Sequence, residues 1–269
     1  MNTVIFILIL LYTTSFCFYF MSIIKGVTRI SPWSYRFILA GSIIQVFVFS
    51  FKMLSEQYFP IITFFYIFFF YSLLLILLTV ITHSFFEWEW FEMVMTFIAI
   101  IMLMGALLIG ETSPQLSDSF ISNLLFIHII LSIISYGAFS ISAIFSLMYI
   151  LQEYLLKRKI WHRFSKGLPS LESLDRNAYL SNLIGVPLLL LGLTFGSIWA
   201  GILFDWKIFV DAKVLTSFFI LLMYGLFIFN RQKRRWMMKQ LAIWNLMSFV
   251  MLIINFTISN LFVSFHRWF

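Results

Sequence analysis

Apolar residues fill this chain in long, nearly continuous stretches that short polar gaps separate. A helix needs about 20 apolar residues to cross the hydrocarbon core of a bilayer. Eight stretches are long enough, at about residues 3–24, 35–54, 60–82, 92–110, 122–152, 181–203, 212–230 and 240–265. Because the runs are continuous and do not alternate with polar positions, they predict helices and not a β-barrel. We expect an all-α, polytopic membrane protein with eight transmembrane helices, forming a single domain over residues 1–269.

Composition supports this fold class. The chain is 62% hydrophobic and 11% charged, whereas soluble domains are about 45–50% apolar and about 25% charged. The surplus of apolar surface must therefore face lipid. The single cysteine, Cys17, excludes a disulfide framework and a CxxCH haem-attachment motif. The first apolar run lacks a basic leader and a small-residue cleavage motif, so we expect it to be retained as a helix.

The basic residues predict the orientation of the helices. The net charge is +7, and most of the 18 Lys and Arg residues fall in the gaps after the first, fifth and seventh spans. Short loops rich in Lys and Arg stay in the cytoplasm, so both termini should be extracytoplasmic. Because the basic residues lie in short gaps between apolar runs, they indicate membrane orientation, and no nucleic-acid partner is expected. The residues concerned are Lys25, Arg29, Arg36, Lys157, Arg158, Lys159, Arg163, Lys166, Arg176, Arg231, Lys233, Arg234, Arg235 and Lys239.

Two histidines are the main candidates for chemistry. In this topology His128 lies near the outer end of the fifth span and His266 at the outer end of the eighth. Two imidazoles at similar depth could provide axial ligands to a haem iron. Alternatively, His128 could hydrogen-bond a neighbouring helix and His266 could be an interfacial residue. We interpret His83 and His162, both on the cytoplasmic side, as ordinary surface histidines.

Other polar and small residues favour packing over chemistry. Gly192, Gly196 and Ala200 recur every four residues and predict a close helix–helix contact. One face of the fifth span predicts the same, with Ser135, Ala138, Ser142 and Ser146. Asn255, Ser259 and His266 share one helical face, for which interhelical hydrogen bonding is favoured over a polar wall below a ligand site. The acidic residues of the third gap, Glu87, Glu89 and Glu92, have no predicted role. No serine-hydrolase, phosphate-loop or HExxH motif is present, so nothing predicts an enzyme.

Three motifs, taken in order, resemble those of the cytochrome c assembly family. They are Leu-Pro-x-Leu-x-x-Leu-Asp at residues 168–175, Gly-x-x-Trp-Ala at 196–200 and Asp-x-Lys at 211–213. The resemblance is strongest over residues 122–269. The family includes the CcsA/ResC-type haem handlers, which present haem on an outer tryptophan-rich loop between two histidines, and the shorter HemX proteins.

The resemblance implies a haem site. His128 and His266 match the two flanking histidines and would ligate the iron of haem b, while four loop positions would contact the cofactor. These are Trp199, Trp206, Asp211 and Lys213. Only Asp211 and Lys213 keep the family's loop pattern and Trp206 is offset, so the chain is most similar to the HemX branch and less to a complete synthase.

The HemX branch implies a regulatory role in a Gram-positive bacterium. The expectation is a plasma-membrane protein that binds or senses haem and modulates haem (tetrapyrrole) biosynthesis by affecting the amount of glutamyl-tRNA reductase. A cytoplasmic enzyme or protease system would be contacted through segments 153–180 and 231–239. Two alternatives stay open at this point. One is a haem-delivery component of c-type cytochrome maturation, and the other is an unrelated transporter, for which Gly185 with Pro187 is the candidate helix break.

Overall fold

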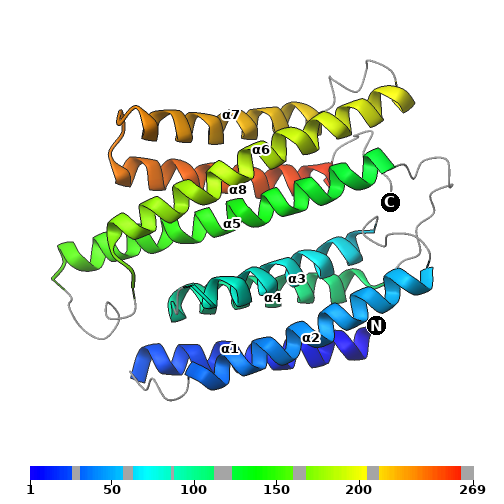
Figure 1. The fold of residues 1–269 in the computed structure, drawn as a ribbon, viewed down its shortest axis with the longest axis horizontal. Helices are drawn as coiled ribbons and strands as arrows, with labels where there is room; N and C mark the ends of the chain where they lie inside the picture. Colours follow the sequence, from blue (N-terminus) through cyan, green and yellow to red (C-terminus); the bar gives the residue numbers. More distant parts are fainter. Residues whose placement is uncertain are drawn as a thin grey trace. The chain divides into compact units, whose positions relative to one another are not determined.

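Eight helices make up nearly all of the chain that the computed structural model describes, namely residues 1–25, 31–56, 63–85, 88–111, 123–159, 168–204 and 212–261. No strand occurs in these ranges, and each helix is long and apolar enough to cross a membrane. The helices are α1 (Asn2–Lys25), α2 (Ser31–Glu56), α3 (Phe64–His83), α4 (Glu89–Ile109), α5 (Asn123–Lys157), α6 (Leu171–Phe204), α7 (Ala212–Gln232) and α8 (Met238–Leu261) (Figure 1). The predicted all-α fold with eight spans is confirmed. The orientation of the termini stays a prediction.

Helix α6 differs most from its predicted span. It begins at Leu171 instead of residue 181, because the backbone N–H of Ser173 donates to Oγ of Ser170 and caps the first turn. Pro187 lies inside this helix, which is helical on both sides of it. The candidate break at Gly185 and Pro187 was therefore wrong, since a proline removes only one N–H from the ladder and neighbouring helices hold the rest.

The chain divides into two compact units, and the first holds α1 to α4. In it, α4 packs on α1 and α3, and α1 also packs on α2. Buried polar groups join three of these helices. The hydroxyl of Tyr12 donates to Gln45 Oε1 at 2.8 Å, and Gln45 Nε2 donates to Ser72 Oγ at 2.8 Å. Gly41 gives Tyr12 its space, because a Cβ at Gly41 would fall 2.4 Å from the Tyr12 ring.

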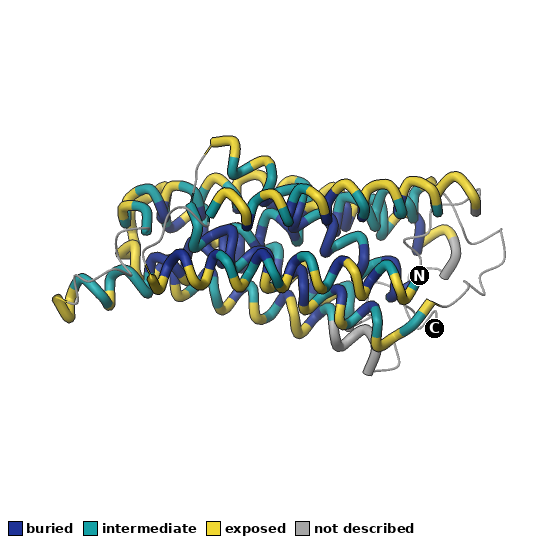
Figure 2. Tube along the Cα trace, turned by 90° about the horizontal axis from the view of Figure 1, so that it is seen from below, coloured by how far each residue is buried: buried dark blue, intermediate teal, exposed yellow. Residues whose placement is uncertain are grey.

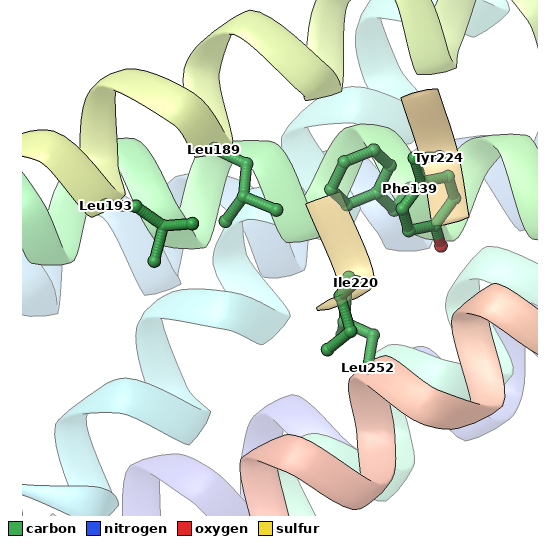
Figure 3. Packing of buried hydrophobic residues seen from close by; sticks show 6 residues of the cluster. All are labelled: Phe139, Leu189, Leu193, Ile220, Tyr224 and Leu252. Carbon is green, nitrogen blue, oxygen red and sulfur yellow. The ribbon is translucent and has the colours of Figure 1, made fainter. Parts of the chain in front are cut away.

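The second unit holds most of α5 together with α6, α7 and α8. A hydrophobic cluster draws on all four helices (Figure 3). At its centre the rings of Phe139 and Tyr224 are stacked, with centroids 3.8 Å apart. The remaining members are Leu189, Leu193, Ile220 and Leu252. Gly185 lies against the Phe139 ring, where a Cβ would approach within 2.7 Å.

A polar network ties α5, α6 and α8 together in the same unit. Asn245 Nδ2 donates to Ser142 Oγ and Ser146 Oγ, both at 2.7 Å, and its Oδ1 accepts from Asn182 Nδ2. Ser142 Oγ in turn donates to the carbonyl of Ala178. The predicted packing role of the α5 serines is confirmed for Ser142 and Ser146. Interhelical hydrogen bonds of this kind contribute about 0.6 kcal/mol each on average in membrane proteins.

Large apolar side chains cover the outside of both units. Phe47 is 69% exposed, Ile43 68% and Leu10 67%. Along each helix exposed positions recur between buried ones (Figure 2). In water such an area of exposed apolar surface would be costly, whereas in a bilayer it contacts lipid. The chain is a multi-pass membrane protein.

Candidate functional site

His128 lies near the start of α5 with its imidazole directed at α6. Its Nδ1 is 2.7 Å from the carbonyl oxygen of Gly192. A carbonyl oxygen can only accept, so Nδ1 carries the proton and donates. The lone pair of the neutral ring is therefore on Nε2. The His128 side chain is half-buried.

The glycines of α6 make this contact possible. A Cβ on Gly196 would fall 2.4 Å from His128 Nδ1, and a Cβ on Gly192 would fall 3.0 Å from Ser132 Oγ. The predicted small-residue contact is confirmed, since α5 and α6 approach each other at these positions. The sequence analysis treated His128 and the glycines as separate features, whereas the structure joins them in one site.

Trp199 is one turn beyond Gly196 on α6. It is 4% exposed and packs with Ala200 against residues of α5 and α7, which are Leu124, Leu125 and Val214. Lys213, in the first turn of α7, is near enough to His128 for a charge interaction between the two side chains. The structure thus gathers His128, Trp199 and Lys213 at one end of this unit, where α5 and α7 begin and α6 ends.

Several predicted site residues lie outside the described residues. These are His266, Trp206 and Asp211, together with Glu87 and His162. Of the α8 face, Asn255 is described. Its Oδ1 accepts from Thr216 Oγ1 at 2.6 Å and its Nδ2 donates to Ser217 Oγ at 3.0 Å. The favoured interpretation, interhelical hydrogen bonding, is therefore confirmed for Asn255.

A second cluster of ionisable groups lies in the first unit, and sequence reasoning missed it. His83, the last residue of α3, places Nδ1 at 2.7 Å from Oε1 of Glu92 on α4. Glu92 is 1% exposed, and its other oxygen accepts a hydrogen bond from the hydroxyl of Tyr19 on α1. Nearby, Ser22 donates to Glu89 at 2.9 Å. The interpretation of His83 as an ordinary surface histidine was wrong.

A bare metal ion has no ready ligand set in the described part of the chain. No group of three or more His, Cys, Asp or Glu side chains converges there. A haem iron has a smaller requirement, because the porphyrin supplies four nitrogens and the protein only one or two axial ligands. Each of the two histidines could fill such an axial position.

Comparison with known proteins identifies the family. The family model described as cytochrome C assembly protein matches residues 61–266. This chain belongs to the cytochrome c assembly protein family. The match includes His128 and its α6 partners as well as His83 and Glu92. It also extends well before residue 122, the start of the segment over which the sequence motifs gave the strongest resemblance.

Two curated relatives narrow the branch. The chain is 34% identical over 261 residues to the protein HemX of Brevibacillus brevis, covering 97% of this chain and 96% of the relative. It is 42% identical over 159 residues to the protein HemX of Bacillus subtilis strain 168, covering 59% of this chain and 57% of the relative. The chain is thus a HemX-like member of the family, as the sequence motifs predicted.

Proposed function

We propose that this HemX-like membrane protein binds haem b between the outer ends of its helices, with His128 and His266 as axial ligands. The observation that carries the proposal is the hydrogen bond from His128 Nδ1 to the Gly192 carbonyl. It fixes the tautomer that leaves Nε2 able to ligate a metal, which is how ligating histidines are usually oriented.

The surrounding residues suit a porphyrin. Trp199 is one turn from Gly196, the residue that lies against the His128 ring, and the positive charge of Lys213 suits the negatively charged propionates of haem. We assign supporting contacts to Trp206 and Asp211 from the family motif. The chemistry of the bound cofactor would be that of its iron, whereas the chain itself binds the porphyrin and orients the ligand.

The test is an absorption titration of the detergent-purified protein with haemin. The wild type should give a sharp low-spin Soret band, and His128→Asn should weaken or shift it, as should His266→Ala. The asparagine amide in His128→Asn could still donate to the Gly192 carbonyl, so packing should survive the change. His162→Ala is the matched control and should leave the spectrum unchanged. An unaltered spectrum in His128→Asn would overturn the assignment.

We further propose that haem occupancy modulates haem biosynthesis in the bacterial plasma membrane. Support comes from the two HemX-named relatives and from the basic segments 153–180 and 231–239, which the positive-inside rule assigns to the cytoplasm. A cytoplasmic enzyme or protease system would contact these segments and change the abundance of glutamyl-tRNA reductase.

This regulatory role can be tested in a strain that lacks the gene. Complementation with the wild type should restore the level of glutamyl-tRNA reductase seen in the parent, measured by immunoblot. Deletion of residues 157–166 should fail to restore it while membrane insertion is retained. Restoration by the deletion variant would contradict a role for this segment.

The family description also favours a second function, haem delivery during maturation of c-type cytochromes. This alternative predicts that the deletion strain loses covalently bound haem from its c-type cytochromes, measured by haem staining of membrane proteins. Normal cytochromes with an altered reductase level would favour the regulatory role.

A further inference from the structure

Four helices bring ionisable and aromatic side chains together at one end of the first unit. Tyr19 comes from α1, Tyr35 from α2, His83 from α3 and Glu92 from α4. The centre of the group is the contact between His83 Nδ1 and Glu92 Oε1 at 2.7 Å. The cluster lies wholly within one compact unit.

Glu92 is an expensive residue to place here. At 1% exposure its carboxylate is removed from solvent, and an uncompensated buried charge costs several kcal/mol. Tyr19 donates a hydrogen bond to Oε2. A carboxylate oxygen is an acceptor, so the natural partner for Oε1 is a proton on Nδ1 of His83. In the neutral ring that donates from Nδ1, the lone pair is on Nε2.

The His83 ring is held in two ways and keeps its Nε2 edge available. The Tyr35 ring stacks on one face, with centroids 3.7 Å apart and an interplanar angle of 16°. Stacking covers a face of the imidazole and leaves the edge that bears Nε2. Within the described residues Nε2 has no hydrogen-bond partner, and the side chain is 23% exposed.

We propose that His83 is the axial ligand of a second haem site, oriented by Glu92 and Tyr35. A histidine that donates Nδ1–H to a carboxylate is a more basic metal ligand, and this arrangement recurs in metalloproteins. Haem fits better than a bare ion because the described residues offer no three-ligand group. The choice of haem rests on the proposed function, whereas the histidine–carboxylate geometry does not.

The first turns of α2 add features that suit a porphyrin. Trp33 is 55% exposed, and the guanidinium of Arg36 lies 4.6 Å from the centroid of its ring. An exposed aromatic surface with an adjacent cation complements an apolar macrocycle that carries carboxylates. Both residues flank Tyr35 in the sequence, so they belong to the same end of the unit.

The experiment separates this site from that of His128. Haemin is titrated into the full-length protein carrying His128→Asn and His266→Ala. We expect about one equivalent to bind still, with a histidine-ligated spectrum, and adding His83→Asn should abolish it. The asparagine amide can still donate to Glu92, so the packing of α3 on α4 should survive, which the melting temperature checks.

Glu92→Gln provides a second readout that simple loss of structure would not give. The neutral amide oxygen accepts a weaker hydrogen bond from Nδ1–H, which makes His83 a less basic ligand. Haem should therefore stay bound while its iron shows a higher reduction potential. Glu89→Gln is the matched control, because it removes a nearby charge and leaves the His83 hydrogen bond in place, so the potential should change less than in Glu92→Gln.

Each result decides between the two sites. No haem in the His128/His266 double variant overturns the His83 site and leaves the proposed function standing. Haem that persists in the triple variant overturns the His83 site as well. Haem that is unaffected by the double variant and removed by His83→Asn alone overturns the His128 site and supports the one proposed here.

Discussion

Gly196 lies so close beneath the imidazole of His128 that a Cβ built on it would fall 2.4 Å from Nδ1. The absence of a side chain at one position thus sets the orientation of a ring on the neighbouring helix. The hydrogen bond from Nδ1 to the Gly192 carbonyl depends on this close approach of α5 and α6.

Gly196→Ala should therefore disturb the site from the opposite helix. The added methyl group must displace the imidazole, and overpacking of this kind costs about 1–3 kcal/mol. Gly201→Ala, also on α6, is the matched control, because its Cβ would meet nothing within 4 Å. Both changes raise helix propensity equally, so the difference in melting temperature in detergent reports the clash. Equal stability of the two variants would contradict it.

Asn245→Ala should loosen the second unit. The change removes hydrogen bonds to Ser142, Ser146 and Asn182 and leaves buried polar groups without partners. We expect a loss of about 1–3 kcal/mol, since each group left unsatisfied costs about that much. Ser248→Ala is the control, because Ser248 is equally buried but bonds its own helix at the Trp244 carbonyl. The free energy of unfolding of each variant is measured by a mixed-detergent titration. A similar decrease for Asn245→Ala and Ser248→Ala would contradict the prediction.

The ion pair between Asp175 and Arg231 should stabilise the fold more than the pair between Glu153 and Lys239 does. Nε and Nη2 of Arg231 donate to Asp175 Oδ2 at 3.0 and 2.7 Å, whereas Lys239 and Glu153 are 3.8 Å apart. A double-mutant cycle with Asp175→Asn and Arg231→Gln should give a coupling of about 1–3 kcal/mol, because hydrogen bonds to charged groups are the stronger kind.

The matched cycle with Glu153→Gln and Lys239→Gln should give less than about 0.5 kcal/mol, as exposed pairs usually do. The free energies of unfolding are compared at one salt concentration. Equal couplings would show that distance and burial do not distinguish the two pairs.

Acid should weaken the first unit through Glu111. Partial burial acts to raise the pKa of Glu111, but hydrogen bonds from Lys52 and Tyr66 outweigh it and hold the pKa below its ordinary value of 4.5. The stabilisation is therefore present above pH 4.5 and is lost as the pH falls through the lowered pKa. Glu111→Gln should flatten the dependence of melting temperature on pH below 4.5. The exposed Glu172→Gln should retain it, and a parallel pair of curves would exclude Glu111 as the cause.

The helices were predictable because long apolar runs have few other solutions in a bilayer. The start of α6 was misplaced because Asp175 and Arg176 lower the hydropathy before residue 181. The stronger signal was local, because Ser170 is a typical N-cap residue and Glu172 is an acidic residue in the first turn. Arg231 neutralises Asp175 from another helix. A window average cannot include a partner that is distant in the sequence.

At the two histidine sites, too, the sequence did not reveal the partners that come from another helix. His128 could be singled out from its depth in a span, but nothing in the sequence indicated that the Gly192 carbonyl would accept its hydrogen bond. The partnership of His83 with Glu92 depends on how α3 and α4 pack after a short connection. The sequence does offer one signal for this pair, namely a histidine at the end of one span and a carboxylate at the start of the next. The signal indicates a contact only when both residues are assigned to the helices and not to the loop between them.

The lengths of α5 and α6 have a consequence for the bilayer itself. With 35 and 34 residues, these helices are about 52 and 51 Å long at about 1.5 Å per residue. Even at a tilt of about 40° each would extend about 40 Å along the membrane normal, beyond a hydrocarbon core of about 30 Å. Their charged ends, at Glu153 on α5 and Glu172 on α6, therefore stand outside the hydrocarbon as ordered helix. A partner on that side would contact the helical ends of α5 and α6, and the thickness of the bilayer would determine how much of each helix is accessible.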